Sequence, residues 1–182
     1  FVKELKQWKF SGFAGLNTLF VALCNNEGFK ALDFSNLKFT ISGGMALTTS
    51  AAEKWKTVTG CDVFEGYGMT ETSPVLTFNP PGGHQLGTIG IAAPNTEIKI
   101  VGDDGKTLPN GEAGELLARG PQVMLGYWNR AAETSATIDE DGFIATGDIA
   151  IMQDDGFLRI VDRKKDMIIV SGFNVYPNEI EE

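Results

Sequence analysis

Cysteine and histidine are scarce in this sequence of 182 residues. Cys24 and Cys61 are the only cysteines, they form no C-x-x-C pair, and His84 is the single histidine. A zinc site needs several such ligands at close spacing, so the sequence argues against one. Cys24 lies in an apolar helical segment and Cys61 at the start of a strand. We therefore expect reduced, buried thiols of a cytosolic protein rather than a disulfide.

Long apolar runs and an excess of positive charge are also missing. No apolar stretch is long enough to span a bilayer, and no signal-peptide pattern occurs. With 24 acidic and 15 basic residues the formal net charge is −9, which disfavours nucleic acid and anionic lipid as partners. The basic cluster of Arg159, Arg163, Lys164 and Lys165 is too short for a nucleic-acid patch, and a solvated run of charges is its alternative interpretation.

The first half of the sequence carries helical and strand periodicity in turn. Apolar residues on one helical face predict a helix over 16–27, which Gly28 is suited to end. Alternating apolar and polar residues over 37–42 predict a strand that runs into Gly43 and Gly44.

A second helix and a second strand follow. Ser50 and Glu53 have the spacing of a capping box, and Gly60 is suited to end the helix that they begin. Residues 62–66 form the next predicted strand. Strand–helix–strand units build parallel sheets, so the glycine-bearing loops at 43–44 and 66–68 should both leave the carboxyl edge, where ligands of open α/β sheets bind.

The second half consists of short strands separated by turns. Asp-Asp-Gly at 103–105 and at 154–156 are strong turn signals. They indicate a small antiparallel barrel or sandwich, and a new strand at 167–170 follows the charged connector DRKKD. The predicted strands of this half are 96–101, 114–120, 142–152 and 156–161.

Several residues have side chains suited to a phosphate or a sugar, each with an ordinary structural alternative. Thr70 and Glu71 could serve a phosphate oxygen and its Mg²⁺, or they could cap a helix. Tyr67 could stack on a flat ring or pack in the core. Asp148, at a predicted strand end, could bind a ribose diol or form a turn, and Arg163 could reach the same sugar or remain a surface charge.

The order of these segments resembles a known family. YGMTET at 67–72 resembles the adenine- and phosphate-binding motif of the adenylate-forming superfamily, which contains acyl-CoA synthetases, nonribosomal adenylation domains and beetle luciferases. SGGM at 42–45, TGD at 146–148 and DRKKDMIIVSGFNVYPNEIE at 162–181 are similar to its other motifs, in the same order. The segment 141–165 looks like the fatty acyl-CoA synthetase signature, and nearly the whole chain is similar to bacterial long-chain fatty-acid–CoA ligases.

This resemblance implies roles for individual residues. Thr70 would bind the α-phosphate, Glu71 would coordinate Mg²⁺, and Lys165 would be the hinge between the two half-reactions, so these three would take part in catalysis. Asp148 would hold the ribose hydroxyls, with Arg163 on the other side of the sugar. Tyr67 would stack on the adenine. The residues that border the adenylate would be Gly43, Gly44, Glu65, Gly66, Tyr67 and Gly68.

The implied architecture is α/β followed by β. Residues 1–84 would be the end of a layered α/β nucleotide-binding lobe and 85–161 a small antiparallel β-barrel subdomain. The hinge would be 162–166, and 167–182 would begin a mobile C-terminal domain. The phosphate loop would precede residue 1 and a catalytic lysine would follow Glu182, so we expect an internal fragment that does not turn over by itself.

The implied reaction joins a fatty acid to CoA. ATP would activate the carboxylate as acyl-AMP with Mg²⁺ as cofactor, and the CoA thiol would then displace AMP. An aryl, medium-chain or carrier-protein-loading ligase of the same superfamily remains an alternative, as does a non-catalytic nucleotide-binding fragment. The expected partners are small molecules and no nucleic acid. The expected location is cytoplasmic, with peripheral association at the inner membrane face as an alternative, and no feature indicates an oligomeric state.

Overall fold

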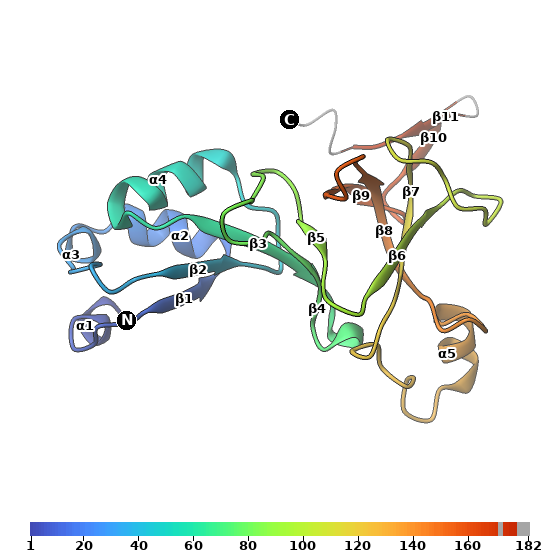
Figure 1. Ribbon diagram of the computed structural model, residues 1–182, viewed down its shortest axis with the longest axis horizontal. Helices are drawn as coiled ribbons and strands as arrows, with labels where there is room; N and C mark the ends of the chain where they lie inside the picture. Colours follow the sequence, from blue (N-terminus) through green and yellow to red (C-terminus); the bar gives the residue numbers. More distant parts are fainter. Residues whose placement is uncertain (171–172, 178–182) are drawn as a thin grey trace.

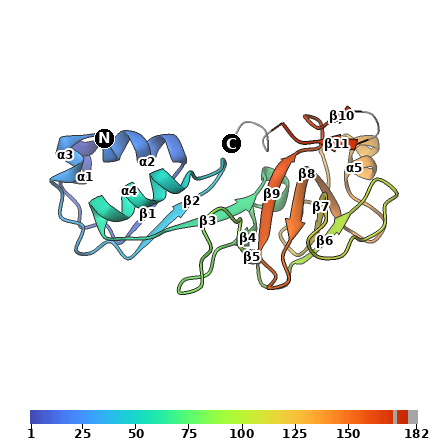
Figure 2. The ribbon, with the colours of Figure 1, turned by 90° about the horizontal axis from the view of Figure 1, so that it is seen from above.

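The computed structural model describes residues 1–170 and 173–177. It is elongated, with a mixed α/β part at one end and a second β-sheet at the other (Figure 1). The first sheet has the strand order β1-β2-β3-β4-β5 and the second has the order β6-β7-β8-β9. A two-stranded hairpin, β10-β11, lies beside the second sheet (Figure 2). The fold is therefore mixed α/β with two main sheets.

The first sheet is parallel at its beginning and antiparallel at its end. β1 and β2 pair in parallel, as do β2 and β3, whereas β4 and β5 join in antiparallel register. The predicted parallel strand–helix–strand unit is thus confirmed. In chain order, the elements are α1 (Val2–Leu5), β1 (Gly12–Gly15), α2 (Asn17–Cys24), α3 (Glu27–Lys30), β2 (Phe39–Ser42), α4 (Thr49–Thr59), β3 (Val63–Gly68), a 3₁₀ turn η1 (Thr70–Thr72), β4 (Val75–Phe78) and β5 (Ile91–Ala92).

The helix predicted over 16–27 is right as far as Cys24 and wrong beyond it. α2 ends at Cys24, and the separate turn α3 begins at Glu27. The side chain of Asn26 accepts a hydrogen bond from the Phe29 amide at 3.0 Å, which caps the new turn. An Asn side chain at this position favours a new helix start over continuation, so Gly28 lies inside α3 instead of ending α2.

The cap of α4 also differs from the prediction. Thr48, rather than Ser50, is the N-cap, and its Oγ1 accepts a hydrogen bond from the Ala51 amide at 3.3 Å. The predicted end is confirmed, because Gly60 takes the left-handed conformation (φ 75°) that ends helices at little cost.

An aromatic cluster joins the helices to the sheet. Both α2 and α4 lie on one face of β1–β3 (Figure 1). Trp55 of α4 is completely buried, and its ring lies 4.8 Å from that of Phe20 and 5.4 Å from that of Phe29. The indole Nε1 donates a hydrogen bond to Thr40 Oγ1 of β2 at 3.1 Å. This core fixes the strand ends that lead into the candidate site.

The second sheet is antiparallel and open. β6 and β9 are its two edges, so the predicted barrel is not closed among the described strands. On the edge formed by β6, Val101 makes an isolated bridge to Thr107. On the edge formed by β9, Leu158 makes an isolated bridge to Gly90, next to β5 of the first sheet. The elements are β6 (Glu97–Val101), β7 (Ala113–Arg119), α5 (Ala131–Thr137), β8 (Ile144–Met152), β9 (Leu158–Arg163), β10 (Ile168–Val170) and β11 (Phe173–Val175).

A second core unites this sheet with the first. Leu76 of β4 is completely buried and packs in one cluster with Leu116, Ile144 and Leu158 of β7, β8 and β9. The four predicted strands of this half and the turn at 154–156 are confirmed. The sequence did not predict β11. Of the C-terminal segment expected over 167–182, residues 178–182 lie outside the described residues.

Candidate functional site

A large open cleft lies where the two sheets meet. Its volume is about 1310 Å³. The first sheet contributes the end of β3 and the loops that follow β2 and β4, and the second contributes β8, β9 and the turn after β9. The lining residues are 44–49, 65–69, 86–89, 146–148, 159–160 and 162–165.

The predicted glycines occupy two different environments. Gly44 lines the cleft with φ +84°, and no atom lies within 4 Å of the position of a Cβ there. Gly43 does not line it, and its amide donates to the Gly15 carbonyl at 3.3 Å. The expected loop at 66–68 is instead the end of β3, which pairs with β4. Gly68 is required there by chain packing, because a Cβ would overlap the Pro74 carbonyl.

Three predicted residues meet across the cleft. The Tyr67 hydroxyl of β3 donates a hydrogen bond to Asp148 Oδ2 of β8 at 2.5 Å, and Arg163 Nε lies 3.7 Å from Asp148 Oδ1. Burial, and then the hydrogen bond to Asp148, raise the pKa of Tyr67 strongly, so the phenol stays protonated at neutral pH. Asp148 lies inside β8, as the strand predicted over 142–152 implies, and not at a strand end, since pairing continues to Met152.

Glu65 brings a buried carboxylate to the same cleft. Glu65 is only 8% exposed, and its Oε1 accepts a hydrogen bond from the Leu47 amide at 3.1 Å. Burial raises the pKa of Glu65, against the lowering effect of the Leu47 and Gly87 amides. Within the described part of the chain Oε2 is buried and has no hydrogen-bond partner. A buried acceptor in this state favours a ligand that brings a donor.

Thr70 and Glu71 lie beyond the cleft lining. They begin η1, whose N-cap is Met69. Thr70 is therefore not the helix cap that the sequence offered as the alternative to a phosphate contact. Glu71 Oε1 accepts a hydrogen bond from the Tyr127 hydroxyl at 2.9 Å. Sequence reasoning missed Tyr127, which is 56 residues away and carries no local motif signal.

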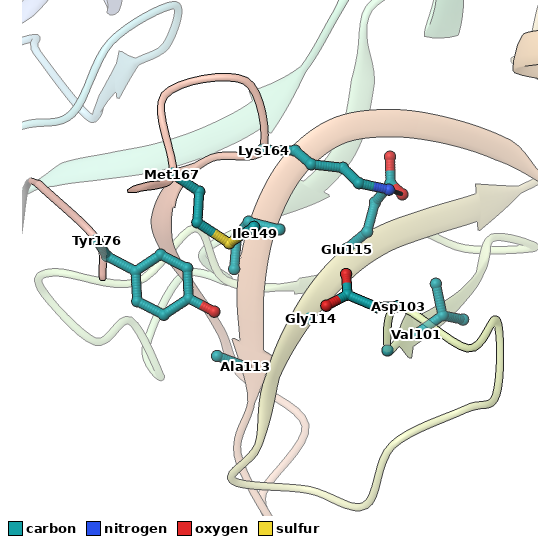
Figure 3. Close-up of a pocket in the computed structure, with 10 residues that line it drawn as sticks. Val101, Asp103, Ala113, Gly114, Glu115, Ile149, Lys164, Met167 and Tyr176 are labelled. Atoms are coloured by element: carbon teal, nitrogen blue, oxygen red, sulfur yellow. Dashed lines mark hydrogen bonds and ion pairs between the residues drawn. The ribbon is translucent and has the colours of Figure 1, made fainter. Parts of the chain in front are cut away.

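Lys165 lies in the turn between β9 and β10 and lines the cleft rim. Its neighbour Lys164, which the sequence did not single out beyond its charge, forms a 2.6 Å ion pair with Glu115 of β7. Figure 3 shows this pair beside a smaller pocket of about 90 Å³, with Met167 and Tyr176 on its other side. The turn that carries Lys165 is therefore tied to the second sheet by its neighbour.

A divalent cation would have to arrive with its own ligands. Within 1–170 and 173–177 no three His, Cys, Asp or Glu side chains come close enough to hold a metal. Mg²⁺ is commonly bound through one or two carboxylates together with substrate phosphates. The single carboxylate of Glu71 therefore fits a cation that is bridged to a phosphate.

Among the helices of the described residues, none has the length and apolar character to cross a membrane.

Comparisons with known proteins give consistent results. The family described as AMP-binding enzyme matches residues 1–128. The chain is 57% identical over its whole length to a long-chain-fatty-acid–CoA ligase of Yersinia pestis, and 39% identical to one of Bacillus subtilis. It spans 32% of the length of each, about a third.

Solved structures have the same fold. The anthranilate CoA ligase AuaEII in complex with anthranoyl-AMP superposes with a TM-score of 0.89 at 32% identity, over 99% of this chain and 35% of that one. ATP-bound MatB from Rhodopseudomonas palustris superposes with a TM-score of 0.87 at 34% identity, over 98% of this chain and 35% of that one.

Proposed function

This chain belongs to the family of AMP-binding enzymes, and we propose from this that the whole protein is an AMP-forming long-chain fatty-acid–CoA ligase. The observation that carries the proposal is the 57% identity to a ligase of that name over all 182 residues. The cleft between the two sheets supports it, because it combines a buried acceptor, a phenol and a carboxylate–guanidinium pair suited to a nucleoside.

The proposed reaction has two steps. The fatty carboxylate attacks the α-phosphorus of ATP, the bond to the β,γ-pyrophosphate breaks, and acyl-AMP forms. The CoA thiol then releases its proton to solvent, its sulfur attacks the acyl carbon, and AMP leaves with the electron pair of the acyl–oxygen bond that breaks. No protein nucleophile is required, since a carboxylate is already an anion at pH 7.

We assign the ribose to Asp148. Its carboxylate can accept hydrogen bonds from both hydroxyls of a diol, and Tyr67 and Arg163 hold it from two sides at 2.5 Å and 3.7 Å. Arg163 has a side chain 64% exposed, so it can also reach the sugar. Glu65 Oε2 is available to an amino group of the base, while Gly44 leaves open space for the adenylate. Gly66 and Gly68, which line the cleft, would border the adenylate through the backbone.

We assign phosphate contacts to η1. Thr70 would donate its hydroxyl to the α-phosphate, and Glu71 would hold Mg²⁺, which when bound neutralises charge on the phosphates. A hydroxyl donor and a cation held by a carboxylate would stabilise the negative charge of the crowded transition state. Both residues lie directly after β3, which carries Tyr67, so one strand would align base and phosphate contacts.

Of the hinge expected over 162–166, residues 162 and 163 belong to β9, and the turn 164–166 is the proposed hinge. Lys165 lies at its centre, and rotation there would move the segment 167–182 between the two half-reactions. The turn is exposed and has one tie to β8, from the Lys164 amide to the Gly147 carbonyl at 2.9 Å, besides the ion pair to Glu115. Few ties of this kind are compatible with a hinge.

Pyrophosphate release by the whole protein, measured over a panel of acids, tests the proposal. Long-chain fatty acids should give the highest kcat/KM, and the product should be the CoA thioester. A preference for aromatic acids would favour the second candidate, a feruloyl-type ligase, because the chain is also 36% identical to a feruloyl-CoA synthase of Amycolatopsis. Absence of acid-dependent pyrophosphate release would contradict both.

A further inference from the structure

The loop between β7 and α5 reaches across to η1 and holds Glu71 at two points. The Met124 amide donates a hydrogen bond to the Glu71 carbonyl at 2.8 Å. The Tyr127 hydroxyl donates to the Glu71 carboxylate at 2.9 Å. One contact fixes the backbone and the other fixes the side chain, so the carboxylate has a defined direction although both residues are partly open to solvent.

Further hydrogen bonds tie the loop between β7 and α5 to its surroundings. The Tyr127 amide donates to Thr134 Oγ1 of α5 at 2.9 Å. Gly126 has φ +148°, and a Cβ there would lie 2.7 Å from the Thr134 side chain, so only glycine fits. On the other side, Gln122 Nε2 donates to the Val75 carbonyl at 3.1 Å and to Thr96 Oγ1 at 2.7 Å. These ties connect the loop to β4 and α5.

We infer that Tyr127 is a positioning residue, which orients the Glu71 carboxylate to receive a divalent cation bridged to a nucleotide phosphate. The inference rests on the metal role proposed above for Glu71. An ionised carboxylate has about four lone-pair sites, so the hydrogen bond to Oε1 leaves room for a cation. Groups that hydrogen-bond a metal-ligating side chain fix its orientation and support metal affinity.

The phenol of Tyr127 is suited to donate. A tyrosine hydroxyl ordinarily carries its proton at neutral pH, so it can donate to a carboxylate, which only accepts. A Phe at this position would keep the ring and lose only the donor, so Tyr127→Phe isolates the hydrogen bond.

The test uses the whole protein and a non-hydrolysable ATP analogue, with binding measured by calorimetry with Mg²⁺ and in EDTA. Tyr127→Phe should weaken Mg²⁺-dependent binding by about tenfold, the lower end for loss of a group supporting a metal ligand. Binding in EDTA should stay unchanged. Trp128→Phe is the matched control, because Trp128 is the next ring in the loop and is 90% exposed. It should behave like the wild type in both conditions.

Glu71→Gln separates failure of this inference from failure of the proposed site. If Glu71→Gln abolishes the Mg²⁺ dependence and Tyr127→Phe leaves it at the wild-type value, the role of Tyr127 is refuted and that of Glu71 stands. If neither variant alters it, the proposed metal role of Glu71 fails as well.

A second measurement covers the case in which Tyr127→Phe does not fold. The wild-type protein is labelled with ¹³C at Cζ of Tyr127 and bound to the non-hydrolysable ATP analogue. The NMR signal of this carbon should shift when Mg²⁺ is added. An unmoved signal would overturn the inference.

Discussion

Replacing Asp148 with Asn should weaken ATP binding by the whole protein while leaving its fold intact. The amide has the same shape and can still accept the Tyr67 hydroxyl hydrogen bond that is 2.5 Å long in the wild type. It loses the negative charge that Arg163 faces at 3.7 Å and that two ribose hydroxyls would use. Hydrogen bonds to a charged group contribute about 1.5–3 kcal/mol and neutral ones about 0.5–1.5 kcal/mol.

The size of the effect follows from those differences. The Asp148 side chain is 20% exposed, so solvent screens part of the charge. We therefore take about 1 kcal/mol for each of two hydrogen bonds, or about 2 kcal/mol in total. That corresponds to a roughly 30-fold increase in the Kd of ATP, measured by calorimetry. Asp154→Asn, in the exposed turn between β8 and β9, is the control. Equal affinities for Asp148→Asn and wild type would refute the ribose assignment.

Three further changes test the core, a buried acid and the hinge. Trp55→Ala removes a completely buried ring and should lower the free energy of unfolding by about 3–5 kcal/mol in urea titration, whereas Trp128→Ala, at a 90% exposed site, should change it little. Burial raises the pKa of Glu65 above its ordinary value of 4.5, so the folded protein holds this proton more tightly than the unfolded chain does. The free energy of unfolding should therefore fall as the pH rises above 4.5, and Glu65→Gln should reduce this pH dependence in thermal unfolding. Lys165→Pro should spare acyl-AMP formation and slow thioester formation, and unchanged rates of both steps would contradict the hinge.

The sequence predicted a helix or strand correctly where both the sequence pattern and the contacts that form the element involve residues close together in the chain. The alternation in 37–42 and the glycine at Gly60 act within a few residues, and β2 and the end of α4 follow them. The break between α2 and α3 was missed because Gly28 was taken as the helix end, although the apolar face that predicts the helix stops at Leu23. The competing term is a single side-chain cap at Asn26, which is worth only about 1 kcal/mol and is hard to weigh in advance.

Long-range contacts of the site could not be predicted from local patterns. Tyr67 and Asp148 are 81 residues apart, and Glu71 and Tyr127 are 56 apart. Taken separately, Tyr67 and Asp148 each had an ordinary alternative, a place in the core for Tyr67 and a turn for Asp148, and only the order of motifs in the resemblance associated the two residues. Tyr127 belongs to none of those motifs, so only the structure reveals it beside Glu71.

The two ends of the candidate site are held with different strength. Tyr67 and Asp148 stand on strands that share the core of Leu76, Leu116 and Ile144, each completely buried, so separating them would expose that core. The turn at 164–166 is tied to β7 by the ion pair of Lys164 with Glu115, whose side chains are 48% and 14% exposed. A pair exposed on one side contributes at most about 1 kcal/mol after solvent screening. Motion is thus least costly at the turn, and a swing there would leave the proposed ribose contacts in place while it carries Lys165 away from the cleft rim.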